Sequence, residues 1–316
     1  MNKSLSIVVP VYNSVQSLTG LVQRIARTLK PMGVEYEIIF VNDASPNPKT
    51  WPHLRRLVAD NPRVRAINLM RNFGQQAATL CGIEVAKGDY VLTMDDDLQH
   101  RPEDIPLLWV KRGHDIVIGQ FPVKRHTLFK RITSRIKGWL DHILIGKPSH
   151  IQMSSFRLMS RAVVDGMKQI YTPYPFIPAL MFYVSKDVVG VEVTHAPRSE
   201  GRSTYTLTKL IGVFANLVIN NSSILLRITG GMGLVFACLS FIFGIYLLLR
   251  KLWVGVSVPG WTSTMLVSIF GIGMILFSLG VIGEYLLRLV VTSEHKPVYV
   301  IRERLEGAAS LGTSVP

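Results

Sequence analysis

The stretch Gly88-Asp-Tyr-Val-Leu-Thr-Met-Asp-Asp-Asp97 joins a helix-ending glycine, a short apolar run and three consecutive carboxylates. A short apolar run bounded by turn residues is typical of a buried strand in a parallel sheet. The segment before it has the pattern of a helix over residues 75–86. We therefore expect a helix there and a strand over 89–94, with Asp95, Asp96 and Asp97 at the carboxyl end of the strand.

The same alternation of strands and helices extends outward from this stretch. Further strands are predicted at residues 5–10, 36–41, 64–69 and 115–119. A helix capped by Asn13 or Ser14 is indicated by apolar residues at helical spacing, namely Val15, Leu18, Leu21, Val22, Ile25 and Leu29. This β-α-β-α order predicts an α/β fold with a mostly parallel sheet flanked by helices. Ligands bind at the carboxyl ends of such strands, where Asp43 and the aspartate triplet lie.

The composition narrows the class of partner. The chain has 316 residues and a formal net charge of +14, which favours an anionic partner such as a membrane surface, a phosphorylated substrate or nucleic acid. No nucleic-acid recognition motif is present, so we expect no nucleic-acid partner. Cys81 and Cys238 are poor candidates for a disulfide. No signal peptide precedes the first strand, so the N-terminal domain is expected in the cytosol.

The C-terminal third predicts a membrane anchor. Residues 228–291 are nearly devoid of charge, and the runs 228–249 and 264–287 are each long enough to cross ~30 Å of hydrocarbon at ~1.5 Å per residue. The basic flanks place both termini in the cytosol and the chain in the inner (cytoplasmic) membrane as a multi-pass protein. A buried soluble helical hairpin is the alternative.

The remaining domain boundaries follow from this hairpin. We expect a cytosolic domain over 1–205, a juxtamembrane amphipathic helix over 206–227 and a cytosolic tail over 292–316. A second amphipathic and basic helix is predicted over 124–140. Both amphipathic helices are either surface helices packed on the core or helices lying in the lipid interface.

The aspartate triplet is a candidate metal site. Asp95 and Asp97 flank one residue at a strand end, so both carboxylates can face one cation. Mg²⁺ and Mn²⁺ prefer oxygen ligands and commonly bridge carboxylates and substrate phosphates. By itself an Asp-x-Asp sequence is a weak signal, which also occurs in surface loops.

Four motifs at the predicted sheet edge strengthen this interpretation, namely Val9-Pro10-Val-Tyr12-Asn13, Val41-Asn42-Asp43, Arg71-Asn72-Phe73-Gly74 and Met94-Asp-Asp-Asp-Leu-Gln99. Together they resemble the nucleotide-binding domain of family 2, GT-A-fold glycosyltransferases. The resemblance implies metal ligation by Asp95 and Asp97, with Asp97 catalytic. It implies donor binding by Pro10, Tyr12, Asn13, Asp43, Arg71, Asp95, Asp96 and Gln99. Residues 71–74 could also be a plain strand-to-helix turn.

Two later motifs extend the match, Ser155-Phe-Arg157-Leu-Met-Ser-Arg161 and Arg198-Ser-Glu-Gly-Arg202-Ser-Thr-Tyr205. With two C-terminal spans, the chain resembles polyisoprenyl-phosphate glycosyltransferases of the bactoprenol glucosyltransferase and dolichyl-phosphate mannose synthase type. The resemblance implies inverting sugar transfer from a nucleotide sugar, with UDP-sugar favoured, to a polyprenyl phosphate, with undecaprenyl phosphate favoured. It also implies a Mg²⁺ or Mn²⁺ cofactor, a role in cell-envelope glycans and a homo-oligomer, with a tetramer as one option.

The acceptor site departs from the family at one position. Members usually read Gly-Asp-Phe-Arg-Leu where this chain has Ser154-Ser155-Phe-Arg157-Leu, so Ser155 replaces the candidate base. We expect Ser155, Arg157, Arg198, Arg202 and Tyr205 to hold the acceptor phosphate, with Ser155 and Arg198 counted as catalytic. The alternatives are a helix cap for the serines and a solvated loop for residues 198–205.

Two rival functions remain at this point. A processive polysaccharide synthase would share the donor domain, but its Gln-x-x-Arg-Trp motif is not found in this sequence. A non-catalytic membrane protein that binds nucleotide sugar is the second rival, because Ser155 departs from the family pattern.

Overall fold

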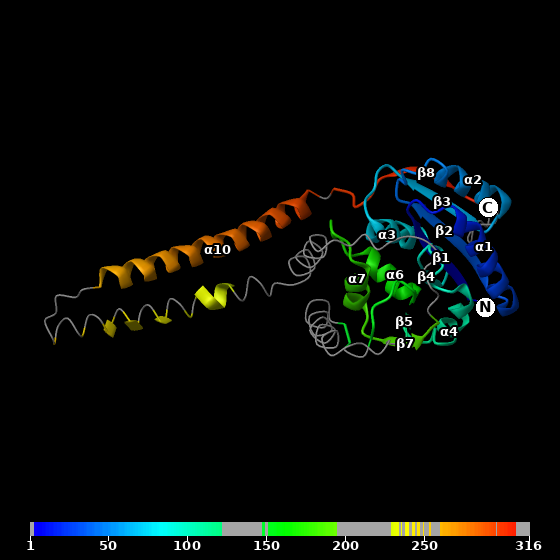
Figure 1. The fold of residues 1–316 in the computed structure, drawn as a ribbon. Helices are drawn as coiled ribbons and strands as arrows, with labels where there is room; N and C mark the ends of the chain where they lie inside the picture. The colour runs from blue at the N-terminus through cyan, green and yellow to red at the C-terminus, as the bar shows by residue number, and fades with distance from the viewer. Residues whose placement is uncertain are drawn as a thin grey trace. The chain divides into compact units, whose positions relative to one another are not determined.

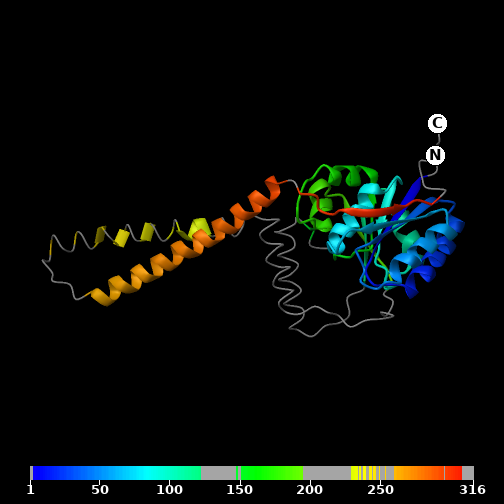
Figure 2. The same cartoon turned by 90° about the horizontal axis from the view of Figure 1, so that it is seen from above.

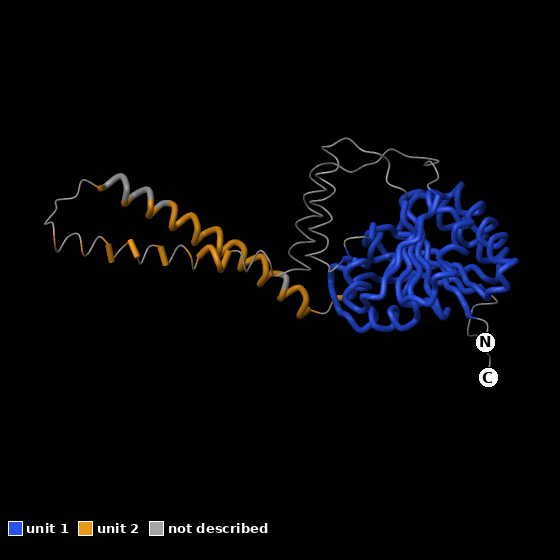
Figure 3. The backbone as a smooth tube through the Cα atoms, turned by 90° about the horizontal axis from the view of Figure 1, so that it is seen from below, with its two compact units in different colours: residues 1–204, 297–316 blue, residues 205–296 orange. Residues whose placement is uncertain are grey.

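The structure is a computed structural model that describes residues 3–121, 147–148, 151–194, 260–294 and 296–307, with scattered helical positions in 229–253. The chain divides into two compact units, one of residues 1–204 with 297–316 and one of residues 205–296 (Figure 3). The predicted helices at 124–140 and 206–227 lie outside the described residues, and so do Arg198, Arg202 and Tyr205.

The first unit is built on one mixed sheet. Its described strands are β1 (Ser4–Val11), β2 (Glu35–Asn42), β3 (Val64–Leu69), β4 (Tyr90–Thr93), β5 (Ile116–Gln120), β6 (Arg157–Ser160), β7 (Val188–Glu192) and β8 (Ile301–Leu305). Their order is β7-β5-β6-β4-β1-β2-β3-β8 (Figure 1). The run β4-β1-β2-β3 is parallel throughout, as predicted, and β5 pairs in parallel with β7. Antiparallel β6 and β8 were not predicted.

Helices flank the sheet, as Figures 1 and 2 show. The described helices of this unit are α1 (Gln16–Leu29), α2 (Thr50–Asp60), α3 (Gln75–Val85), α4 (Ile105–Val110), α6 (Arg161–Lys168) and α7 (Ile177–Val184), with 3-10 turns η1 (Lys30–Met32) and η2 (Pro102–Asp104). Apolar residues of α1, α2 and α4 share one buried core with alternate residues of β1, such as Leu5 and Ile7. On the other face α3 packs so near β1 that a side chain at Gly82 would clash with Val8.

Two predicted helix caps are wrong. Helix α1 begins at Gln16 without a side-chain cap, so neither Asn13 nor Ser14 caps it. The cap alternative for Ser154 and Ser155 is also wrong, because the helix that follows begins at Arg161 and is capped by Ser160. The polar residues before these helices are therefore available for other contacts.

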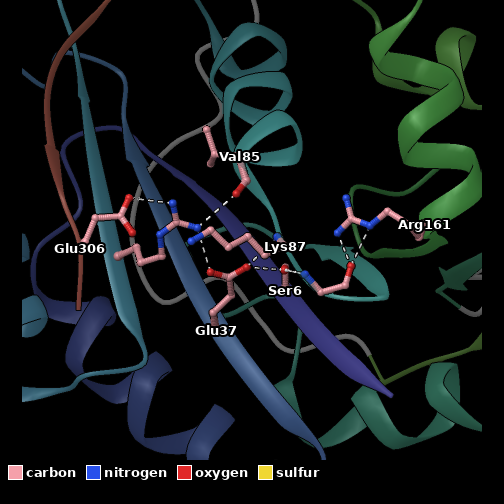
Figure 4. Close-up of polar contacts among 8 residues, drawn as sticks. Ser6, Glu37, Val85, Lys87, Arg161 and Glu306 are labelled. Carbon is pink, nitrogen blue, oxygen red and sulfur yellow. Dashed lines mark hydrogen bonds and ion pairs between the residues drawn. The ribbon is translucent and has the colours of Figure 1, made fainter. Parts of the chain in front are cut away.

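A buried polar cluster ties the C-terminal segment to the sheet (Figure 4). Arg65 donates to Glu37 at 2.9 Å and to Glu306 at 2.8 Å. The Glu37 carboxylate is fully buried and also accepts from the Ser6 hydroxyl at 2.6 Å and the Lys87 backbone N–H at 2.9 Å. A buried charge needs such partners because its desolvation is costly.

The last strand, β8, covers the β3 edge. The Met70 backbone N–H donates to the Val300 carbonyl at 2.8 Å, and Arg302 donates to the Met70 carbonyl at 3.2 Å. Glu303 accepts from Arg55 at 2.8 Å and from the Trp51 indole at 3.0 Å. Pairing removes the open edge that β3 would otherwise present. Most of the tail that the sequence predicts after residue 292 therefore belongs to the first unit.

The second unit contains α10 (Trp261–Ser293), a helix of 33 residues. Its segment Phe270–Ser293 contains an 18-residue window with a mean hydropathy of 1.9 and is long and apolar enough to cross a membrane. This helix contains the predicted span 264–287. The predicted span 228–249 is described at scattered helical positions, with gaps between them, so the two-helix hairpin stays a prediction.

Candidate active site

A cavity of about 840 Å³ opens at the carboxyl ends of β1, β2 and β4, the sheet edge that the sequence predicts for ligand binding. Seven of the predicted site residues line it, namely Pro10, Tyr12, Asn13, Asp43, Asp95, Asp96 and Asp97. Arg71, Gln99, Ser155 and Arg157 do not line it.

Asp95 is held at both carboxylate oxygens. Gln75, the first residue of α3, donates from Nε2 to Oδ1 at 2.7 Å. The Ser155 hydroxyl, from the segment before β6, donates to Oδ2 at 2.6 Å. The Asp95 backbone N–H donates to Nδ1 of the buried His100 at 3.1 Å. The main chain and the carboxylate are thus both fixed from neighbouring elements.

The ring of His100, which accepts the Asp95 N–H, is itself held in place by two aromatic rings. It stacks between Phe121 and Phe156, with ring centroids 5.7 Å and 5.3 Å away. Because Nδ1 accepts the Asp95 N–H, the neutral ring carries its proton on Nε2. The sequence signal for His100 is its place directly after the aspartate motif.

Asp96 and Asp97 take different positions on the cavity wall. Asp96 receives hydrogen bonds from the Ser14 side chain and the Tyr12 backbone, and burial raises its pKa to about 6. Its Oδ2 atom is buried and has no hydrogen-bond partner among the described residues. Asp97 accepts the Gln99 N–H at 3.1 Å, in a turn where Leu98 has a positive φ of 63°. Asp96 thus lines the cavity as a residue, while its Oδ2 atom is covered by protein.

Asp43 fixes the turn that follows β3. Its two oxygens accept the backbone N–H groups of Phe73 at 2.7 Å and Gly74 at 2.9 Å. Burial raises the pKa of the Asp43 carboxyl, and these two hydrogen bonds oppose the rise. Arg71 lies over the Phe73 ring, 4.8 Å from its centroid, and does not line the cavity. Asp43 thus acts on the turn as well as lining the cavity.

The end of β1 is shaped by a second turn. Asn13 has a positive φ of 68°, a conformation that asparagine tolerates better than most residues. Its N–H donates to the Ser45 hydroxyl at 2.9 Å, and its side-chain oxygen accepts the Asn47 N–H at 3.1 Å. Tyr12 is left half exposed at the cavity rim. This rim suits a flat aromatic ligand.

Arg157 lies beneath the site and is buried. It donates from Nε to the Thr93 hydroxyl at 3.2 Å, and that hydroxyl donates to the Ser155 carbonyl at 2.6 Å. Burial lowers the pKa of the guanidinium to about 10, while the charge of Asp95 favours the protonated form. Arg157 supports the strand end and does not face the cavity.

The donor set fits a divalent cation that shares ligands with a substrate. Asp95 and Asp97 both line the cavity with carboxylate oxygens, the ligands that Mg²⁺ and Mn²⁺ prefer. No group of three or more His, Cys, Asp or Glu side chains that could enclose a metal occurs in the described part of the chain. A cation here would complete its coordination with phosphate oxygens or water, as Mg²⁺ commonly does.

Six polar cavity residues were missed by the sequence analysis, namely Ser14, Gln16, Ser17, Asn47, Asn72 and Gln75. Asn72 lies inside the motif Arg71-Asn72-Phe73-Gly74, and Gln75 directly follows that motif. Their position after a predicted strand was the available signal, because every residue there lies near the same sheet edge.

Comparison with known proteins gives a family match, similar proteins over nearly the whole chain and a solved structure that resembles part of it. The family model described as Glycosyl transferase family 2 matches residues 6–167. An uncharacterized glycosyltransferase of Synechocystis sp. is 33% identical over 96% of both chains. An undecaprenyl-phosphate 4-deoxy-4-formamido-L-arabinose transferase of Aeromonas hydrophila is 31% identical over 98% of this chain and 96% of its own. A glucosyl-3-phosphoglycerate synthase structure from Mycobacterium tuberculosis, with Mn²⁺ and UDP, is 15% identical over 69% of this chain and 78% of its own, with a TM-score of 0.49.

Proposed function

The chain belongs to glycosyltransferase family 2, and we propose that it transfers a sugar from a nucleotide sugar to a polyprenyl phosphate at the cytoplasmic membrane face. The observation that carries the proposal is the cavity in which Asp43, Asp95, Asp96 and Asp97 meet. The relative from Aeromonas hydrophila, whose name gives undecaprenyl phosphate as the acceptor, matches along nearly the whole chain. This match favours undecaprenyl phosphate as the acceptor.

The donor occupies the cavity. Tyr12 at the rim stacks on the base, and the amide and carboxylate groups of Asn13 and Asp43 bind the nucleoside. Asp96 lines the same cavity and is proposed to contact the donor there. A cavity of about 840 Å³ is in the range of small-molecule sites, about 300–1,000 Å³. UDP-sugar is the favoured donor class, and Pro10 lies in the cavity wall. Arg71 and Gln99, which do not line the cavity, stay predicted donor contacts.

Asp95 and Asp97 would hold Mg²⁺ or Mn²⁺. When bound, the cation neutralises the charge that develops on the diphosphate leaving group. Asp97 would be catalytic in this sense, because its carboxylate would help to hold the cation. Because Asp95 and Asp97 are partly buried, this electrostatic effect would be larger than in water.

The transfer is a single displacement with inversion. An oxygen of the lipid phosphate forms the bond to the anomeric carbon, and the bond from that carbon to the diphosphate oxygen breaks. The electron pair leaves with the nucleoside diphosphate. A phosphate is already an anionic nucleophile, so no general base is needed and positioning supplies much of the rate. Arg198, Arg202 and Tyr205, outside the described residues, are proposed to hold this phosphate.

The membrane brings donor and acceptor together. The helix α10 is long enough to anchor the transferase at the surface where the lipid phosphate lies. We propose the predicted order of a cytosolic domain over 1–205 and two spans within 228–291, with both termini cytosolic. A homo-oligomer is compatible with this arrangement.

The test is transfer by the purified protein in detergent. Undecaprenyl phosphate and Mg²⁺ or Mn²⁺ are supplied with labelled UDP- and GDP-sugars one at a time, and the label extracted into organic solvent is counted. We expect lipid-linked label from one donor, with a loss of about 10²-fold or more in Asp97→Ala and in EDTA. Leu107→Ala, a change at an exposed helix position, is the control.

Two outcomes would contradict the proposal. Label in a long polymer would favour a processive polysaccharide synthase. Donor binding without transfer to any polyprenyl phosphate, in protein that melts cooperatively, would favour a non-catalytic binding protein.

A further inference from the structure

We propose that Gln75 and Ser155 are positioning residues that hold the Asp95 carboxylate in the orientation in which it binds the divalent cation. The inference rests on the proposed function and assigns a role to two residues that stand outside the aspartate motif. The two residues come from different elements, the start of α3 and the segment before β6.

The direction of both hydrogen bonds is fixed by chemistry. An ionised carboxylate only accepts, so the Gln75 amide must present its NH₂ group and Ser155 must present its hydroxyl hydrogen. The two donors reach different oxygens, Oδ1 at 2.7 Å and Oδ2 at 2.6 Å. Held at both oxygens, the carboxylate cannot turn about its terminal bond without losing two charge-assisted hydrogen bonds.

The arrangement leaves room for a cation. A carboxylate offers about four lone-pair sites, and the two donors use two of them. Asp95 still lines the cavity beside Asp97. Hydrogen bonds to a metal-binding side chain orient that side chain before the metal binds. Loss of such hydrogen bonds typically lowers metal affinity by about 10- to 100-fold.

Ser155 is itself held in place through its backbone carbonyl. Its carbonyl accepts the Thr93 hydroxyl at 2.6 Å, and the buried Arg157 donates to that hydroxyl at 3.2 Å. The hydroxyl of Ser155 has one hydrogen, and that hydrogen is engaged with Asp95. A lipid phosphate could take it only by breaking the contact with Asp95. The geometry therefore assigns Ser155 to the metal side of the site instead of the acceptor side.

The experiment uses full-length protein in detergent. Electron paramagnetic resonance measures the dissociation constant of Mn²⁺ in the presence of saturating UDP, and transfer assays measure KM for undecaprenyl phosphate. The variants are Ser155→Ala and Gln75→Leu, which each remove one donor, and Ser155→Thr, which keeps the hydroxyl. The matched control is Ser154→Ala, because the Ser154 hydroxyl accepts the Phe156 N–H and does not contact Asp95.

We expect Ser155→Ala and Gln75→Leu each to raise the Mn²⁺ dissociation constant by about 10- to 100-fold, with KM for the lipid unchanged. Ser155→Thr and Ser154→Ala should bind Mn²⁺ as the unchanged protein does. Thermal melting of every variant separates this effect from misfolding, and either donor variant suffices if the other does not fold.

Two results would overturn the inference alone while transfer by the unchanged protein stands. One is an unchanged Mn²⁺ dissociation constant in Ser155→Ala and Gln75→Leu. The other is a higher lipid KM in Ser155→Ala at normal Mn²⁺ affinity, which would return Ser155 to the acceptor site. An unchanged protein that neither binds Mn²⁺ nor transfers sugar would overturn both the inference and the proposed function.

Discussion

Replacing Arg65 by methionine should destabilise the first unit strongly, because it leaves the Glu37 carboxylate buried without a cation. Glu37 is fully buried, and Arg65 is the cation that contacts it, at 2.9 Å. Methionine fills a similar volume, so the change removes the charge and the hydrogen bonds more than it removes packing. Glu306, the second partner of Arg65, is about half exposed.

The magnitude follows from these burials. Removing one partner of a buried ion pair costs about 3–5 kcal/mol, and the lower end applies because Glu37 keeps its hydrogen bonds from Ser6 and Lys87. About 3 kcal/mol lowers Tm by about 6–12 °C in a domain of about 150–250 residues. Glu306→Gln is the control, and it should cost less than about 1 kcal/mol because a surface ion pair is worth little.

A double variant tests the cause. Ser6 and Lys87 both donate to Oε1 of Glu37, whereas Arg65 donates to Oε2. Glu37→Gln keeps an oxygen for the first two donors and removes the charge. Adding it to Arg65→Met should therefore recover much of the lost Tm, because no uncompensated buried charge remains.

The assay is thermal unfolding in detergent, followed by tryptophan fluorescence. A double variant less stable than Arg65→Met alone would refute the reasoning from an unpaired charge. A Tm loss in Glu306→Gln as large as that in Arg65→Met would show that the exposed contact, and not the buried one, stabilises this region.

Three further predictions follow from single contacts. Asp43→Asn should raise the KM for the donor by about 10-fold and leave the KM for the lipid unchanged. The reason is that one amide oxygen cannot accept both N–H groups of the 73–74 turn, and a charge-assisted hydrogen bond is worth about 1.5–3 kcal/mol. A normal KM for the donor would contradict this. Burial raises the pKa of Asp96 to about 6, so the folded state binds that proton more tightly than the unfolded state and the unchanged protein loses stability as pH rises from about 4 to 6. The difference in Tm between Asp96→Asn and the unchanged protein, measured in EDTA, should therefore rise as the pH goes from about 4 to 6. A difference that stays constant over this range would refute the raised pKa of Asp96. Gly88→Ala should cost about 1–3 kcal/mol in thermal melts, because its Cβ would lie 2.6 Å from a backbone nitrogen of β1, while Gly113→Ala, with open space around it, is the control.

The sequence patterns predicted the central strands well for a physical reason. A parallel strand buried on both faces is mostly apolar, so β1, β2, β3 and β4 stand out as largely apolar runs with a few buried polar residues such as Glu37 and Arg65. The strands β6 and β8 have no such pattern. In β8, the charged residues Arg302, Glu303 and Arg304 stand in a row between Ile301 and Leu305. The strand forms because the β3 edge and partners such as Arg55 are available to it.

Among the cavity residues too, some features follow from the sequence and others depend on the tertiary structure. The sequence by itself determined that Asp43 and the aspartate triplet meet at one sheet edge, because residues after parallel strands gather there whatever their long-range contacts. Only the tertiary structure decided how each side chain is used. Gln75 and Ser155 lie 20 and 60 positions from Asp95, and Arg157 is turned into the core. Side-chain contacts of this kind depend on how helices and strands pack, and no local pattern of residues encodes that packing.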